Sequence, residues 1–348
     1  MPPALPGSYL VLETTNRCSL QCVHCSVSEK GHPHHERVGM LPLRTVERLL
    51  DDLIAADGHF DSLVLFWLGE PLIHPEFAAI YQSCLRAAVD HRVFNRVEVH
   101  TNATHLDPGV LRVALNGATT PQTWHFSLDA ATEATYRRIK GADRYAKVSA
   151  QVEAFLAERR RRQARWPRPV LQFIVSDQNE QEIEGFARHW EATCSRLGLA
   201  TRRAAQHVPA GDDVVIFYRQ LDCPTPDEQE RQNAVFRKNM ADIGLALPAP
   251  TRSPLSLAGH STPCAAFWKS PVISWDGRVT TCTRDNRLEN SLGSLWDTPF
   301  SELWWGSAMR AKRARVARGD YAGLSACAGC FVPRSANHPE LSPAELAG

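Results

Sequence analysis

The sequence predicts an α/β protein whose main part is a partial (β/α)6, TIM-like barrel, followed by a small C-terminal α+β domain. Six short apolar runs alternate with helical patterns along residues 8–208, and strands separated by helices pair in parallel through right-handed crossovers. Six such units suit an open, incomplete barrel better than a closed barrel of eight units. After Val208 the alternation ends, and a strong β-hairpin signal follows at residues 271–282.

The first predicted element is a buried strand at residues 8–13, which leads directly into a group of cysteines. Strands and helices then alternate according to their apolar periodicity. The further strands are predicted at 62–68, 96–101, 123–128, 170–175 and 202–208, and the helices at 43–56, 75–89, 108–116, 142–161 and 180–197. In barrels of this kind the chemistry lies at the carboxyl ends of the strands, so the polar residues that follow each strand are candidate site residues.

The chain divides into four regions by composition. The region after the barrel holds a polar helix candidate near 227–243 and a Pro/Ser-rich run at 248–254, which is typical of a linker. The next region opens with two alternating apolar runs joined by Asp276-Gly277, a dipeptide typical of hairpin turns. The predicted regions are the barrel at 1–208, a connecting segment at 209–262, the second domain at 263–335 and a tail at 336–348.

Composition excludes several classes of protein. The chain has 348 residues, of which 43% are hydrophobic and 22% charged, as in ordinary globular proteins. The 39 basic and 38 acidic residues nearly cancel, so no nucleic-acid partner is expected. We find neither an apolar run long enough to span a membrane nor a secretory signal at the N-terminus. The expectation is therefore a cytoplasmic protein without a membrane partner.

The ten cysteines are the most informative feature. A cytosolic chain of this length does not need a disulfide framework, so metal binding explains them better. Cys18, Cys22 and Cys25 lie within eight residues directly after the first strand, close enough to bind one metal centre. Three such ligands suit a [4Fe–4S] cluster with one iron left open, whereas structural zinc sites fill all four positions. A chance cluster, or three ligands of a zinc site, is the alternative.

The spacing Cys18-x-x-x-Cys22-x-x-Cys25, together with Phe66-Trp-Leu-Gly-Glu-Pro71 after the second strand, resembles the radical S-adenosylmethionine (SAM) superfamily. In that family the open iron binds SAM, which is cleaved to a 5′-deoxyadenosyl radical. The second segment is similar to the family's Gly-Gly-Glu-Pro segment, with Leu68 in place of the first glycine. The resemblance implies SAM contacts at His24, Gly69, Glu70, Pro71, Thr101, Asn102, Ser127, Asp129 and Val175.

A second group of cysteines lies in the last quarter of the chain, at Cys264, Cys282, Cys327 and Cys330. Their spacing resembles the auxiliary-cluster domain of radical SAM enzymes called SPASM, in its shortened twitch form. The resemblance implies a second, auxiliary [4Fe–4S] cluster that carries electrons. Taken alone, two distant cysteines and a Cys-x-x-Cys pair also suit a zinc ribbon.

Two further residues are candidates for catalysis. Cys223, in a polar loop after the barrel pattern, is a possible hydrogen-atom donor, with a buried structural thiol as the alternative. His207, at the end of the sixth predicted strand, is a candidate acid or base, and a structural role competes with it. Cys84 and Cys194 lie on predicted amphipathic helices, where we expect them in the core.

The resemblance implies an oxidoreductase that takes electrons from an external donor such as flavodoxin or ferredoxin. The one-cluster form resembles 2-deoxy-scyllo-inosamine dehydrogenases, so the first interpretation is oxidation or epimerisation of a sugar-like or aminocyclitol small molecule in antibiotic biosynthesis. The second interpretation is a maturase that modifies a peptide or protein. A zinc-binding adaptor without catalytic activity is the third.

Overall fold

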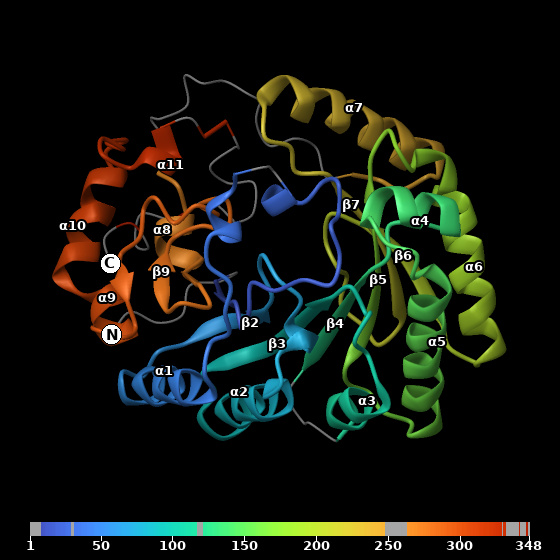
Figure 1. Ribbon diagram of the computed structural model, residues 1–348, viewed down its shortest axis with the longest axis horizontal. Helices are drawn as coiled ribbons and strands as arrows, with labels where there is room; N and C mark the ends of the chain where they lie inside the picture. The colour runs from blue at the N-terminus through green and yellow to red at the C-terminus, as the bar shows by residue number, and fades with distance from the viewer. Residues whose placement is uncertain are drawn as a thin grey trace. The chain divides into compact units, whose positions relative to one another are not determined.

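The computed structural model describes residues 8–28, 31–116, 121–247, 263–328 and 330–331, with the single residues 341 and 346 (Figure 1). The chain forms two compact units. The first comprises residues 1–17, 31–98 and 252–348, and the second comprises residues 18–30 and 99–251. The strand β3 (Phe94–Thr101) carries the chain from the first unit into the second.

The first unit is built on five strands in the order β10-β9-β8-β1-β2. β1 pairs in parallel with β2 and with β8, while β8, β9 and β10 pair antiparallel. The C-terminal hairpin therefore lies beside β1 and extends the sheet at that edge. The strands are β1 (Tyr9–Leu12), β2 (Phe60–Leu65), β8 (Val272–Ile273), β9 (Arg278–Thr280) and β10 (Gly293–Ser294).

The α-helices of the first unit bury apolar side chains. Helix α1 buries Val46, Leu49, Leu50 and Leu53, the spacing of a single helical face. Phe60 of β2 packs against aromatic rings of α9. The helices of this unit are α1 (Leu43–Ala55), α2 (Phe77–His91), α8 (Ala266–Lys269), α9 (Phe300–Trp305), α10 (Ser307–Val316) and α11 (Ser325–Ala328), with short 3₁₀ turns η2 (Pro33–His35) and η3 (Pro71–Ile73).

The second unit has four parallel strands in the order β4-β5-β7-β6. Phe155 of α5 packs on Trp124 and Phe126 of β4, and Phe186 of α6 packs on Phe173 of β5. The strands are β4 (Gln122–Ser127), β5 (Arg168–Val175), β6 (Thr201–Ala205) and β7 (Val214–Gln220). The helices are α3 (Pro108–Ala114), α4 (Glu133–Lys140), α5 (Tyr145–Arg161), α6 (Ile183–Arg196) and α7 (Pro226–Asp242), with short 3₁₀ turns η1 (Ser26–Ser28) and η4 (Glu180–Glu182).

The predicted α/β class is confirmed, and so is the hairpin around Asp276-Gly277. The short helices α8 to α11 and the strand β10 of the first unit had no sequence prediction, and two elements of the second unit also differ from it. Strand β7 falls in the region predicted as a connecting segment and lies between β5 and β6, which makes the sixth predicted strand an edge strand. Helix α4 was not predicted at all. The linker predicted at 248–254 lies outside the described residues, and no described helix is long and apolar enough to cross a membrane.

Candidate functional site

The first cysteine group lies on a tightly turned loop in the second unit. The backbone N–H of Cys25 donates to the carbonyl of Cys22 at 3.0 Å, and Ser28 donates to Cys25 O at 2.9 Å. The hydroxyl of Ser28 also donates to Cys22 O at 2.7 Å. Burial raises the pKa of the Cys22 thiol, and the nearby charge of Cys25 adds to that increase. The loop therefore brings these two thiols together, with Cys18 exposed at its start.

The end of helix α4 holds this loop in place. The N–H of Gln21 donates to Lys140 O at 3.2 Å, and the N–H of Val23 donates to Ile139 O at 2.9 Å. Gly141 ends the helix with φ of 69°, and a Cβ there would lie 2.7 Å from Gln21 O. Only glycine combines this left-handed conformation with such a close approach. The hydroxyl of Thr132 caps the other end of α4, so a cap and a glycine were the sequence signals for this helix.

A buried ion pair lies beside the loop. Lys140 is 1% exposed and Asp129 is 0% exposed, and the Lys140 ammonium donates to Asp129 Oδ2 and, at 3.0 Å, to Ser127 Oγ. The second carboxylate oxygen, Asp129 Oδ1, accepts from the N–H of Ile174 at 2.7 Å. The carboxylate predicted to contact SAM is thus held by protein donors. Lys140 was missed by sequence reasoning.

The charges of this pair keep both partners ionised. Burial alone would raise the pKa of Asp129, but Lys140 outweighs it and the pKa of Asp129 lies below its ordinary value. Burial would lower the pKa of Lys140, and Asp129 more than offsets this and raises it. His24, whose Nε2 lies 3.9 Å from Asp129 Oδ2, has its pKa lowered by burial to about 4. At neutral pH its imidazole is therefore uncharged.

The residues after β3 connect to the start of the cysteine loop. The side-chain N–H of Asn102 points to Cys18 Sγ at 3.6 Å, and Asn102 Oδ1 accepts from the hydroxyl of Thr104 at 2.6 Å. That hydroxyl also lies 2.6 Å from Ser19 Oγ. Thr101 turns inward, where its hydroxyl accepts from the N–H of Ala103 at 2.9 Å. The predicted residue Asn102 is therefore brought to the cysteine loop within this unit.

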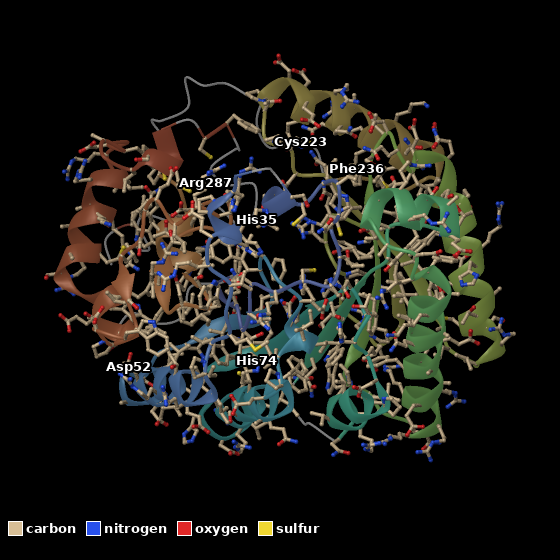
Figure 2. All side chains as sticks on the ribbon, in the orientation of Figure 1. His35, Asp52, His74, Cys223, Phe236 and Arg287 are labelled. Carbon is tan, nitrogen blue, oxygen red and sulfur yellow. The ribbon has the colours of Figure 1, made fainter. Side chains whose placement is uncertain are left out.

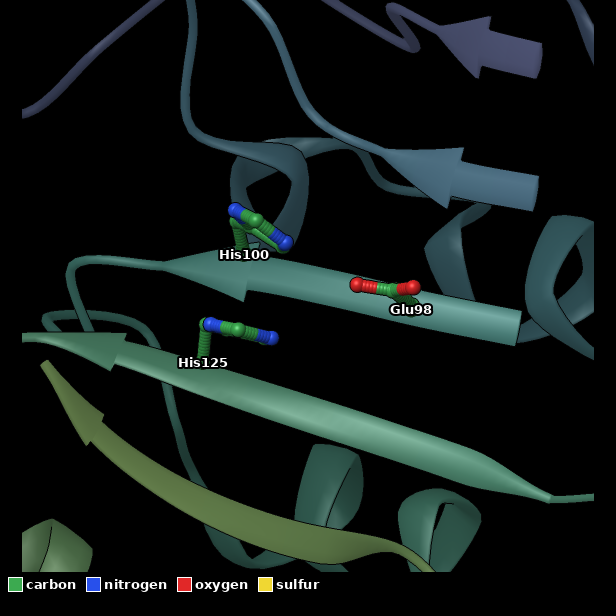
Figure 3. A group of neighbouring side chains, drawn as sticks. All are labelled: Glu98, His100 and His125. Atoms are coloured by element: carbon green, nitrogen blue, oxygen red, sulfur yellow. The ribbon is translucent and has the colours of Figure 1, made fainter. Parts of the chain in front are cut away.

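Val175, at the end of β5, is fully buried. His100 on β3 and His125 on β4 stack with ring centroids 4.1 Å apart (Figure 3). Alternate residues of a strand share a face, so these rings lie on the same faces as Asn102 and Ser127. Sequence reasoning also missed this pair.

In the first unit, the loop after β2 approaches the chain that precedes the cysteines. A Cβ on Gly69 would lie 2.1 Å from Thr15 O, so no other residue fits there. The N–H of Glu70 donates to Arg17 O at 2.7 Å. The Glu70 carboxylate accepts from the N–H of Leu72 at 3.1 Å, and Pro71 begins the turn that Glu70 caps. The predicted segment Gly69–Pro71 thus forms a backbone cradle against residues 15–17.

The second cysteine group converges in the first unit. Burial raises the pKa of the Cys282 thiol to about 12, and the charges of the other three cysteines add to the effect while the N–H of Arg284 opposes it. Two N–H groups point at sulfur: Arg284 N to Cys282 Sγ at 3.4 Å and Asn290 Nδ2 to Cys327 Sγ at 3.3 Å. The four thiols that meet here are Cys264, Cys282, Cys327 and Cys330.

Both cysteine groups fit the metal centres proposed for them. Four converging thiols with N–H donors aimed at sulfur are the donor set of a fully ligated iron–sulfur cluster, because such donors stabilise thiolate ligands. Burial keeps the Cys282 thiol protonated at neutral pH, and a metal that binds there would displace this proton. Three cysteines on the first loop leave one position of a cubane cluster open for SAM.

The two residues predicted as candidates for catalysis differ in exposure. Cys223, labelled in Figure 2, follows β7. Its side chain is buried, at 3% exposure, and its backbone N–H donates to Gln229 Oε1 at 2.9 Å. His207 follows the edge strand β6 and is exposed. Cys84 and Cys194 are fully buried on α2 and α6, which confirms their expected place in the core.

Comparisons with known proteins agree with this geometry. The family model of the radical SAM superfamily matches residues 12–188, and a model described as an iron–sulfur cluster-binding domain, SPASM, matches residues 264–331. Mycofactocin maturase MftC of Mycobacterium ulcerans (strain Agy99) is 28% identical over 208 residues. That match covers 58% of this chain and 48% of MftC, so the chain spans about half the length of this curated relative.

Two solved structures share the fold. SuiB of Streptococcus suis bound to S-adenosylmethionine superposes with a TM-score of 0.57 at 13% identity, covering 96% of this chain and 76% of SuiB. The enzyme anSMEcpe with bound AdoMet gives a TM-score of 0.57 at 14% identity, covering 87% of this chain and 79% of anSMEcpe. At these identities the similarity establishes the fold, a partial barrel followed by a SPASM domain.

Proposed function

The chain belongs to the radical SAM superfamily, and we propose that it is a maturase that modifies a peptide or protein by radical chemistry. As a member of that family it is an enzyme that binds a [4Fe–4S] cluster and SAM, and its SPASM domain binds auxiliary iron–sulfur. When bound, the cluster and SAM supply a 5′-deoxyadenosyl radical that removes a hydrogen atom from carbon. The remaining task of the protein is to hold, orient and shield the reactants.

In this proposal the first cluster is held by Cys18, Cys22 and Cys25, and the auxiliary one by Cys264, Cys282, Cys327 and Cys330. The backbone cradle at Gly69 receives the SAM amino group, and the absence of a side chain there lets this segment lie directly against the backbone of Thr15. Neutral His24 abuts the adenine, and Val175 packs on it. Asn102 and Ser127 form hydrogen bonds with the polar groups of SAM. The hydroxyl of Ser127 is oriented by hydrogen bonds with Lys140 and Asp129.

The observation that carries a peptide substrate is the relationship to MftC, whose name describes a maturase. Two solved relatives by fold are also described with peptides: SuiB bound to the precursor peptide SuiA, and anSMEcpe bound to AdoMet and a Cp18Cys peptide. Together these favour the peptide interpretation over the aminocyclitol interpretation that the sequence suggested first. The zinc-adaptor interpretation loses its basis, since residues 264–331 match an iron–sulfur domain.

The substrate class can be tested with the full-length protein. After anaerobic reconstitution, formation of 5′-deoxyadenosine from SAM is measured with reduced flavodoxin or ferredoxin as the electron donor. Fractions of an extract from the cells that naturally make this protein, separated by size, are added as the source of substrate. The fraction that stimulates 5′-deoxyadenosine above the background is then treated with protease. Loss of stimulation after protease supports the peptide substrate. Stimulation that survives protease and remains in the small-molecule fraction supports sugar or aminocyclitol oxidation instead. The variant Cys22→Ala serves as the inactive control.

A further inference from the structure

The carboxylate of Glu13 joins two distant segments of the first unit. Glu13 follows β1 and is 1% exposed. Its Oε1 accepts from the N–H of Leu68 at 3.1 Å, within the loop that contains Gly69. Its Oε2 accepts from the hydroxyl of Ser274 at 3.0 Å and from the N–H of Trp275 at 3.1 Å, in the turn of the C-terminal hairpin. One buried side chain thus bonds to both segments at once.

The backbone beside Glu13 reinforces this connection. The N–H of Val11 donates to Pro271 O and the N–H of Glu13 donates to Ile273 O, each at 2.9 Å, so the hairpin strand β8 is paired with β1. A second hydrogen bond joins the same loop to the domain that contains Cys264, Cys282, Cys327 and Cys330. The indole N–H of Trp67 donates to Thr283 O at 3.0 Å. Thr283 directly follows the thiol of Cys282. The loop after β2 is therefore attached to the auxiliary-cluster domain at two points, through Glu13 and through Trp67.

A carboxylate at this position is costly, which argues that it has a task. Burying a charged group destabilises a protein unless hydrogen bonds compensate for the loss of water. Despite three such bonds, burial raises the pKa of Glu13 to about 7. An apolar residue would fill the space without that cost, yet it would leave the N–H groups of Leu68 and Trp275 without an acceptor.

We propose that Glu13 is a positioning residue that couples the SAM-binding loop at 67–71 to the auxiliary-cluster domain. Loading of the auxiliary cluster orders the hairpin at 272–280, Glu13 transmits that order to Leu68, and the neighbouring Gly69 cradle is fixed for SAM. SAM and the auxiliary cluster thereby favour each other's binding, as linkage requires. This inference rests on the proposed function, which assigns SAM to the Gly69 loop.

A double-mutant cycle on the reconstituted full chain tests the coupling. The dissociation constant of SAM is measured by equilibrium dialysis for the wild type, Cys327→Ala, Glu13→Ala and the double variant. We expect Cys327→Ala to weaken SAM binding about tenfold when Glu13 is present, and to have little further effect when Glu13 is absent. Additive effects of the two changes would overturn the proposal. The exposed residue Glu47 on α1 provides a matched control as Glu47→Gln.

Hydrogen–deuterium exchange separates this inference from the proposed function. Glu13→Gln retains one oxygen for Leu68 but places an NH₂ group against the N–H of Trp275, so it is the milder variant if Glu13→Ala does not fold. We expect faster exchange in peptides covering 66–73 and 272–280 together. If the wild type binds no SAM, but exchange in both peptides is faster in the Glu13 variants, the proposed function is wrong. The connection that Glu13 makes between the two segments is then still supported. Unchanged exchange in either peptide in both variants would refute the tie.

Discussion

Breaking the buried pair of Lys140 and Asp129 is expected to destabilise the protein strongly. The substitution Lys140→Met removes the charge but keeps an apolar chain of similar length. It leaves the fully buried Asp129 carboxylate with the N–H of Ile174 and the hydroxyl of Ser127 as donors. Leaving one buried charge without its partner costs about 3–5 kcal/mol. We therefore expect the free energy of unfolding at pH 8 to fall by about that amount, in urea titrations followed by circular dichroism under anaerobic conditions.

The pH dependence gives this prediction a sign. In the wild type the pKa of Asp129 is lowered, so its contribution to stability is present at neutral pH and is lost only as the pH falls through that low value. In Lys140→Met burial acts alone and raises the pKa of Asp129, so the variant recovers stability as the carboxyl group protonates. The difference between the two proteins should therefore be larger at pH 8 than at pH 5.

Two further variants distinguish the loss of the charge pair from a general loss of packing. The double variant Lys140→Met/Asp129→Asn retains an oxygen for the N–H of Ile174 and contains no buried charge, so it should regain much of the lost stability. The exposed residue Lys147 on α5 is a matched control, and Lys147→Met should be nearly neutral. A loss below about 1 kcal/mol for Lys140→Met at pH 8, or a loss equal at pH 5 and pH 8, would refute the reasoning.

Three other predictions concern the loop, Glu13 and the two cysteine groups. Gly141→Ala should lower the iron bound after reconstitution, because its Cβ would lie 2.7 Å from Gln21 O; wild-type iron content would contradict the role of that glycine. The pKa of Glu13 is raised from 4.5 to about 7, so at about 1.4 kcal/mol per unit its contribution of about 3 kcal/mol is present below pH 4.5 and lost as the pH rises through 7. Denaturant titrations of Glu13→Gln should lack this slope, and an unchanged slope would show that another group titrates. Cys22→Ala should abolish 5′-deoxyadenosine formation, whereas Cys327→Ala should retain some uncoupled formation without modified product; product from the second variant would exclude an essential auxiliary cluster.

The sequence predicted those parts of the site that depend on local spacing. The cysteine spacing, the segment before Pro71 and the alternation of strands and helices all have signals within a few residues. β7 was missed because no helix separates it from β6, so the expected alternation did not apply there. α4 was missed because it is short and mostly polar, although Thr132 and Gly141 mark its ends.

The partners of buried charges could not be predicted in the same way. A lysine or glutamate is normally exposed, and nothing in the residues around Lys140 or Glu13 shows that the fold buries them. Lys140 is buried because Asp129, eleven residues earlier, turns into the same space. Glu13 is buried by a hairpin 261 residues further along the chain. Such contacts depend on tertiary packing, and so does the choice between a peptide and a small molecule.

The pairing of β1 with β8 has a consequence for how the chain folds during synthesis. The N-terminal strand leaves the ribosome early, but one of its two neighbours is made only after residue 272. Until then β1 exposes one edge of unpaired backbone groups, a surface that invites association with other chains. Contacts between residues this distant in sequence also form slowly. We therefore expect nascent or prematurely terminated chains to depend on chaperones, and production at low temperature with slow translation to raise the soluble yield.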